Sequence, residues 1–129
     1  LLALDGIVTV PRSELSYATG TTAQLSAPAL GLDLVIVAED LGGGLTLLRD
    51  LRGPVGLLRH RPDGRVDLAL ENGDRFEGES RAIGFRRGRL AEQIGLADQD
   101  GRRLTLMIGF SPEELASGAG GTAAERPKG

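Results

Sequence analysis

Residues 59–65, with the sequence Arg-His-Arg-Pro-Asp-Gly-Arg, carry four basic side chains. Guanidinium and imidazolium groups bind phosphate, sulfate or carboxylate through charge-assisted hydrogen bonds. Further arginines follow at residues 86–89 and 102–103. If these turns gather at one end of the fold, they form a composite basic patch. The candidate anion-binding residues are Arg59, His60, Arg61, Arg65, Arg86 and Arg87.

Acidic side chains lie beside these arginines and give the same segments a second interpretation. Asp63, Asp67, Asp98 and Asp100 are placed to neutralise the positive charge. Charged turn tips of this kind also prevent strand edges from pairing with other chains. The arginines are therefore either an anion-binding surface or a set of solvated turn tips.

Catalysis by His60 is not expected from the sequence. A Ser-His-Asp triad requires a carboxylate that orients the imidazole, and only Asp63 and Asp67 lie nearby in the chain. His60 is the only histidine and the chain has no cysteine, which argues against a zinc site. We therefore predict no metal, no cofactor and no enzymatic activity.

Two groups of carboxylates could bind a metal ion in principle. Residues 98–101, Asp-Gln-Asp-Gly, begin like a calcium loop, but the glycine falls too early and the acidic ligand at the end is missing. Glu77 and Glu79 would lie on the same face of a strand. This arrangement suits a metal site or an acid–base pair, and it suits a solvent-facing surface equally well. The glycines at 42–44 lack the Gly-Lys-Ser/Thr ending of a phosphate-binding loop and predict a flexible connection between sheets.

Four hairpin turns predict the architecture: Asp63-Gly64, Asn72-Gly73, Arg87-Gly88 and Asp100-Gly101. Asp-Gly and Asn-Gly favour two-residue type I′ turns, because both central residues need positive φ. This spacing predicts an all-β antiparallel domain, a sandwich or a partly closed meander barrel of about eight to ten short strands. The expected strands are residues 1–10, 32–38, 55–60, 65–71, 74–80, 81–86, 89–96 and 102–110.

The sequence predicts the secondary structure of some segments more clearly than that of others. Residues 32–38 are apolar without alternation, which predicts burial on both faces. Residues 45–51 fit a helix or a strand, and residues 11–31 fit a loop or a weak hairpin. In residues 102–110, apolar and polar side chains alternate as in a half-buried strand.

The C-terminal residues carry a helix start and then a low-complexity tail. Ser111 and Glu114 form a capping box around Pro112, so a short helix is expected there. We expect a single β domain over residues 1–117, loop-rich at 11–31, and a flexible Gly/Ala-rich tail over residues 118–129.

Composition limits the function classes. The 129 residues are 40% hydrophobic, with three Phe, one Tyr and no Trp, which argues against base-stacking surfaces for single-stranded nucleic acid. The net charge of −3 also counts against a polyanion partner. No apolar run reaches the ~20 residues that span a bilayer. Because the chain starts at Leu1, we expect a processed product or an excerpt. An extracellular, envelope or virion-like location is favoured over the cytoplasm.

The function favoured by the sequence is a non-enzymatic structural or protein-interaction module of a larger bacterial assembly, such as a phage-like particle, an envelope complex or a surface filament. It would contact a protein partner, or copies of itself, through strand edges or a flat sheet face. The alternative is an anion-binding β domain that recognises nucleic acid or another polyanion through its arginine-rich turns.

Overall fold

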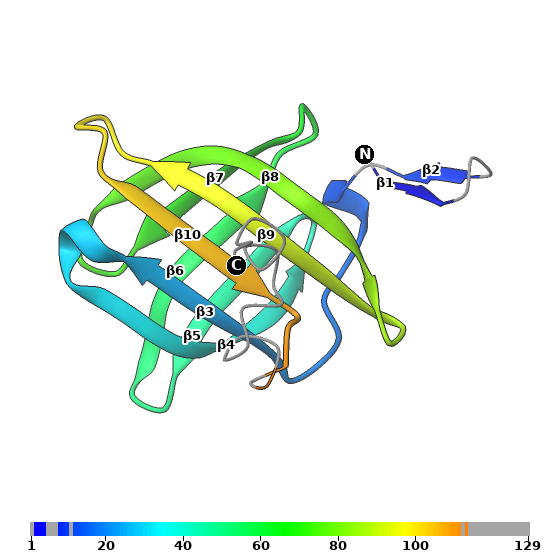
Figure 1. Ribbon diagram of the computed structural model, residues 1–129, viewed down its shortest axis with the longest axis horizontal. Coiled ribbons are helices and arrows are strands. Elements are labelled where there is room, and N and C mark those ends of the chain that lie inside the picture. The colour runs from blue at the N-terminus through cyan, green and yellow to red at the C-terminus, as the bar shows by residue number, and fades with distance from the viewer. Residues whose placement is uncertain (1, 5–7, 11, 112, 114–129) are drawn as a thin grey trace, which may run out of the picture.

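The computed structural model describes residues 2–4, 8–10, 12–111 and 113, and in this part eight antiparallel strands close into a barrel (Figure 1). The strand order around the barrel is β10-β3-β4-β5-β6-β7-β8-β9. The barrel strands are β3 (Thr21–Ala27), β4 (Leu32–Gly42), β5 (Leu45–Asp50), β6 (Gly53–His60), β7 (Arg65–Leu70), β8 (Arg75–Arg86), β9 (Arg89–Ala97) and β10 (Arg103–Ile108). The predicted all-β class is confirmed.

Four short elements of the described residues lie outside the barrel wall. Strands β1 (Leu2–Leu4) and β2 (Val8–Val10) form a separate two-stranded sheet, where the sequence predicted one strand. The 3₁₀ turns η1 (Arg12–Glu14) and η2 (Pro28–Leu30) precede β3 and β4. The predicted helix at residue 112 and the predicted tail at 118–129 fall outside the described residues, apart from Glu113.

Alternating side chains fill the barrel with a mainly aliphatic core. On β10, Leu104, Leu106 and Ile108 point inward and are almost fully buried, as the alternation in the sequence predicts. Phe76 is the largest fully buried side chain. Closure gives every barrel strand a partner on each side along part of its length, so the barrel has no continuous free strand edge.

The hairpin glycines lie where the sequence places them, but three of the four turns differ from the predicted type. Only Arg87-Gly88 is a two-residue turn with positive φ at both positions. In the connections that contain Gly64, Gly73 and Gly101, a backbone hydrogen bond encloses three residues (62–64, 71–73 and 99–101), of which the glycine alone has positive φ. An extra residue lets the preceding Asp or Asn keep negative φ, and Asp63 and Asn72 each accept a backbone N–H two residues ahead at 2.9 Å.

Three other segments resolve or correct the sequence predictions. The ambiguous residues 45–51 contain strand β5, because β4 and β6 pair with it on both sides. The two strands expected at 74–80 and 81–86 are one long strand, β8, with an irregularity between Ser80 and Ala82. The prediction that residues 32–38 are buried on both faces is wrong: Val35 is 65% exposed, because in the described residues no second layer covers the outside of β4.

The antiparallel order sorts the loops between two ends of the barrel. Loops 43–44, 61–64 and 87–88 lie at one end, where residues 12–20 also enter the barrel. Loops 28–31, 51–52, 71–74 and 98–102 lie at the other end. Strand β7 begins at Arg65, opposite Glu79, whereas β8 continues to Arg86. The β8–β9 hairpin therefore projects beyond β7 at the end where the N-terminal segment enters.

Candidate functional site

Four polar side chains meet inside the barrel, at the end where the N-terminal segment enters. Glu92 lies on β9 and points inward, between the buried residues Leu90 and Ile94. His60, the last residue of β6, also points inward. Arg12 in η1 and Tyr17 in the following loop complete the cluster. We call these four residues the Glu92 cluster.

Hydrogen bonds to the Glu92 carboxylate hold the cluster together. Arg12 donates from Nε to Oε1 at 2.9 Å, and the Tyr17 hydroxyl donates to the same oxygen. The His60 Nε2 lies 3.0 Å from both carboxylate oxygens. The Arg12 guanidinium also stacks 4.7 Å from the centre of the Tyr17 ring. The cluster thereby joins Arg12 and Tyr17 to Glu92, which lies 80 and 75 residues away in sequence.

The protonation of the cluster follows from these contacts. Burial alone would raise the pKa of Glu92, but His60, Arg12 and Tyr17 outweigh it and lower the pKa to about 2. Burial raises the pKa of Tyr17 well above its usual value, and the Glu92 charge adds to the increase. Glu92 is therefore an anion at neutral pH. Because an ionised carboxylate only accepts hydrogen bonds, the proton of a neutral His60 sits on Nε2.

The chemistry of the cluster is limited by its burial. A His–Glu pair can act as a base when a substrate reaches the second ring nitrogen, and the His60 Nδ1 has no partner among the described residues. However, none of the four side chains is more than 7% exposed, and Glu92 is fully buried. In this conformation the cluster fastens the N-terminal segment over the end of the barrel. Within the described residues, no group of three or more His, Cys, Asp or Glu side chains could hold a metal ion.

The structure places His60 elsewhere than the sequence predicted. The sequence placed it on an exposed hairpin tip, with only Asp63 or Asp67 to orient it. The side chain is instead 3% exposed and oriented by Glu92. The strand parity explains this, because His60 shares the inward face of β6 with Leu58. His60 therefore does not lie on the same surface as the arginines of its turn.

The arginines predicted to bind anions occupy different environments. Arg59 lies on the exposed outer face of β6, whereas Arg61 is paired with Asp63 and Asp67 at 3.1 and 3.2 Å. Arg65 on β7 is paired with Glu79 and, more distantly, with Glu77 (3.3 and 3.7 Å).

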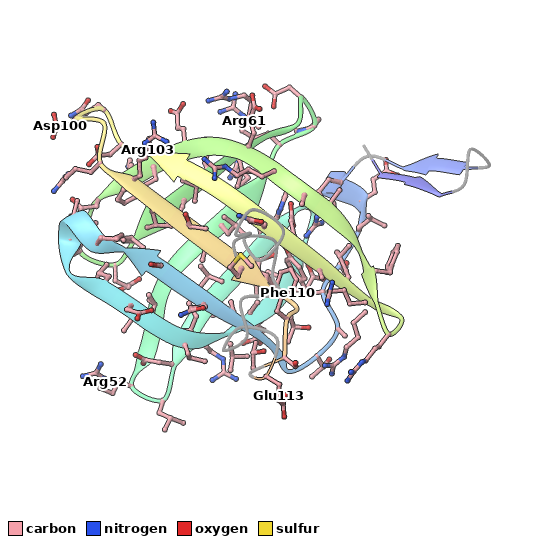
Figure 2. All side chains as sticks on the ribbon, in the orientation of Figure 1. Arg52, Arg61, Asp100, Arg103, Phe110 and Glu113 are labelled. Atoms are coloured by element: carbon pink, nitrogen blue, oxygen red, sulfur yellow. The ribbon has the colours of Figure 1, made fainter. Side chains whose placement is uncertain are left out.

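The other two arginine-rich turns lie at opposite ends of the barrel. Arg86 stacks on the Phe110 ring at 5.1 Å, and Arg87 occupies the β8–β9 tip. This tip and the β6–β7 turn share one end, but Arg103 begins β10 at the other end. Figure 2 shows Arg61 and Arg103 on separate hairpins of the barrel. The three arginine-rich turns therefore do not form one patch, and anion binding by the predicted residues stays a prediction.

No family model, no curated protein and no solved structure matches this chain. Its function must therefore be argued from its own residues. In the described part of the chain, no helix has the length and the apolar character needed to cross a membrane.

Two surfaces on the outside of the barrel are candidate binding surfaces. On β4–β6, apolar side chains point outward, among them Val35 and Leu57. On β8–β10, a shallow groove runs over Gly95 and Ala97 and is bordered by Arg65, Arg81 and Arg103. Because the barrel interior is filled by side chains, another molecule would bind on outer surfaces such as these two.

The lowered pKa of Glu92 predicts acid sensitivity. The pKa of Glu92 is about 2 in the folded state and 4.5 for an ordinary glutamate, so ionised Glu92 contributes its full stability above about pH 5 and loses it as the pH falls towards 2. The free energy of unfolding should drop by roughly 2 kcal/mol between pH 6 and pH 3 from this group alone. Urea denaturation at both pH values measures it.

Two variants separate Glu92 from other acid-sensitive groups. Asp63 also has a lowered pKa, chiefly because the Arg65 backbone N–H bonds to it, so part of the decrease belongs to the surface. Glu92→Gln should show a clearly smaller decrease, whereas Glu79→Gln, at an exposed carboxylate, should keep the wild-type decrease. Equal decreases in wild type and Glu92→Gln would refute the assignment.

Proposed function

We propose that this barrel is a non-enzymatic protein-interaction module of a larger assembly, and that it makes its contacts through the outer face of β4–β6. The observation that carries the proposal is the apolar character of that face. Val35 is 65% and Leu57 37% exposed, and Val37, Leu45 and Leu47 are partly exposed beside them. We call these five residues the outer apolar face.

The strand register makes Leu47 and Leu57 direct neighbours and places Val37 diagonally from Leu47. Leu47 on β5 lies directly opposite Leu57 on β6, and Leu45 is the next outward residue on β5. On the adjacent strand β4, Val37 lies opposite Arg49, and Val35 is the preceding outward residue. Covering apolar surface is worth about 25 cal/mol per Å², and contiguous exposed apolar side chains often mark protein contact sites.

The charges on the same face suit a second copy of the chain as the first partner. Arg49 and Glu39 form a half-exposed ion pair at 2.9 Å beside Leu47. Arg59, across from Leu45, has no ion-pair partner among the described residues. A face that carries apolar side chains and both signs of charge can be complementary to itself across a two-fold axis.

A pair of matched variants tests the role of this face. Leu57→Asp introduces a charge into the outer apolar face, directly beside Leu47, and should reduce self-association at least about tenfold, because a desolvated charge without a partner is costly at an interface. Leu51→Asp makes the same change at a fully exposed position in the β5–β6 turn and should leave association unchanged. Sedimentation equilibrium at several concentrations measures both. Equal association of the two variants would contradict the proposal.

A further inference from the structure

A groove on the outer face of β8–β10 contains two arginines whose charges are not paired. Gly95 and Ala97 of β9 form its floor, and Arg81, Arg103 and Thr105 border it. We propose that this groove binds a single phosphate group through Arg81 and Arg103. The groove lies on other strands than the outer apolar face, so this site does not depend on self-association.

A β-bulge places Arg81 over the groove. Ser80 pairs with Ile94 and Ala82 pairs with Gln93, so Arg81 is the extra residue of β8 with no partner of its own on β9. Bulges of this kind turn a side chain out of the regular alternation and redirect it. Arg81 therefore reaches across β9 where a regularly paired residue would not.

Gly95 lets the Arg81 guanidinium lie directly on the strand. A Cβ at this position would overlap the Arg81 Nε and lie 2.9 Å from its Cζ. The absence of a side chain at Gly95 thus provides the space that the guanidinium occupies. The φ of Gly95 is not in the left-handed region, so the backbone alone does not require glycine here.

The charge of Arg81 and Arg103 is not neutralised within the described residues. Neither residue has an ion pair or a side-chain hydrogen bond there, although Glu77 and Glu79 also border the groove. Those two carboxylates are held by Arg65, at 3.7 and 3.3 Å. The groove therefore offers two free guanidinium groups next to acids that are already paired.

The register brings a hydroxyl group to the same place. Thr105 of β10 lies opposite Gly95, and Arg103 is the preceding outward residue of β10, opposite Ala97. An anion above Gly95 could thus accept from the Arg81 guanidinium, from Arg103 and from the Thr105 hydroxyl.

The same surroundings define the class of ligand. Paired N–H donors of arginine match the oxygens of a phosphate group, and the contacts are charge-assisted. Glu77 and Glu79 border the β8 side and would repel a long polyanion such as a nucleic-acid backbone. The site therefore fits one phosphate group, either the free ion or part of a phosphorylated molecule.

Titration of the ¹⁵N-labelled chain with sodium phosphate, at constant ionic strength kept with sodium chloride, tests the site. We expect saturable shifts of the backbone amides of Arg81, Gly95, Arg103 and Thr105, with a dissociation constant roughly in the low millimolar range for the bare ion. Arg81→Gln should weaken binding at least about tenfold. No saturable shift at these amides would overturn the proposal.

Two more variants separate the geometry of the site from its net charge. Gly95→Ala leaves every charge in place but displaces the Arg81 guanidinium, and should weaken phosphate binding at least about fivefold. Arg87→Gln removes one charge at the β8–β9 tip and should change affinity by less than about twofold. Equal affinities of wild type, Gly95→Ala and Arg81→Gln would overturn the proposal. The unshifted amides in each spectrum show whether the variant is folded.

Two further ligands distinguish the sources of the phosphate group. A heptapeptide with one phosphoserine represents a phosphorylated protein segment, and ribose 5-phosphate represents a phosphorylated small molecule. Tighter binding of either, relative to inorganic phosphate, assigns that source. Equal affinity for all three assigns the phosphate group alone. Binding of neither phosphorylated ligand would overturn the claim that the groove accepts phosphorylated molecules.

Discussion

Glu92→Gln is expected to lower the free energy of unfolding at pH 7 by about 3–5 kcal/mol, the cost of leaving one partner of a buried ion pair without its counter-charge. The substitution keeps the size of the side chain, so a cavity does not account for the effect. It leaves the Arg12 guanidinium 7% exposed with no carboxylate, and it removes the strongest acceptor for Tyr17 and His60. Urea denaturation followed by circular dichroism measures the change.

A matched variant and a local probe make this result specific. Glu79→Gln removes an exposed carboxylate and should change stability by less than about 0.5 kcal/mol. If the Glu92 cluster fastens the N-terminal segment, tryptic cleavage after Arg12 should also be faster in Glu92→Gln than in wild type. A Glu92→Gln protein as stable as wild type, with unchanged cleavage, would show that the cluster does not hold this segment.

Leu106→Ala should destabilise the barrel by roughly 2–5 kcal/mol, as other cavity-forming substitutions in protein cores do. Leu106 is fully buried on β10, and its cross-strand neighbours are Leu25 on β3 and Ile94 on β9. The closed wall leaves little room for these neighbours to move into the space. Thermal and urea unfolding give the difference in stability.

The neighbouring outward position provides the control for this substitution. Met107 lies on the outer face of the same strand and is only partly buried, so Met107→Ala should cost clearly less than Leu106→Ala. A loss of less than about 0.5 kcal/mol for Leu106→Ala would mean that β10 does not line the core.

The fold could be predicted to the level of class, and its closure could not. The hairpin glycines and the alternation along residues 102–110 locate most barrel strands correctly. However, the pairing of β3 with β10 joins segments about 80 residues apart, and no local pattern encodes it. The apolar run at 32–38 looked fully buried because the sequence does not show that β4 has solvent on its outer side.

The sequence analysis did not predict the Glu92 cluster, although the local pattern indicates that two of its four residues, Glu92 and His60, point inward. Glu92 alternates with Leu90, Ile94 and Leu96, and His60 lies two residues after Leu58, so both belong to apolar strand faces. A charged residue on such a face indicates a buried partner. Arg12 and Tyr17 lie in an irregular segment without periodicity, so only the structure could supply those partners.

The absolute mass of the wild-type chain in solution, measured by light scattering after size exclusion, tests the proposed interaction module most directly. We expect an oligomer well above 13.5 kDa at tens of micromolar chain, at both low and moderate salt, because the outer apolar face supplies most of the contact. A mass of 13.5 kDa at every concentration and at both salt conditions would contradict self-association through β4–β6.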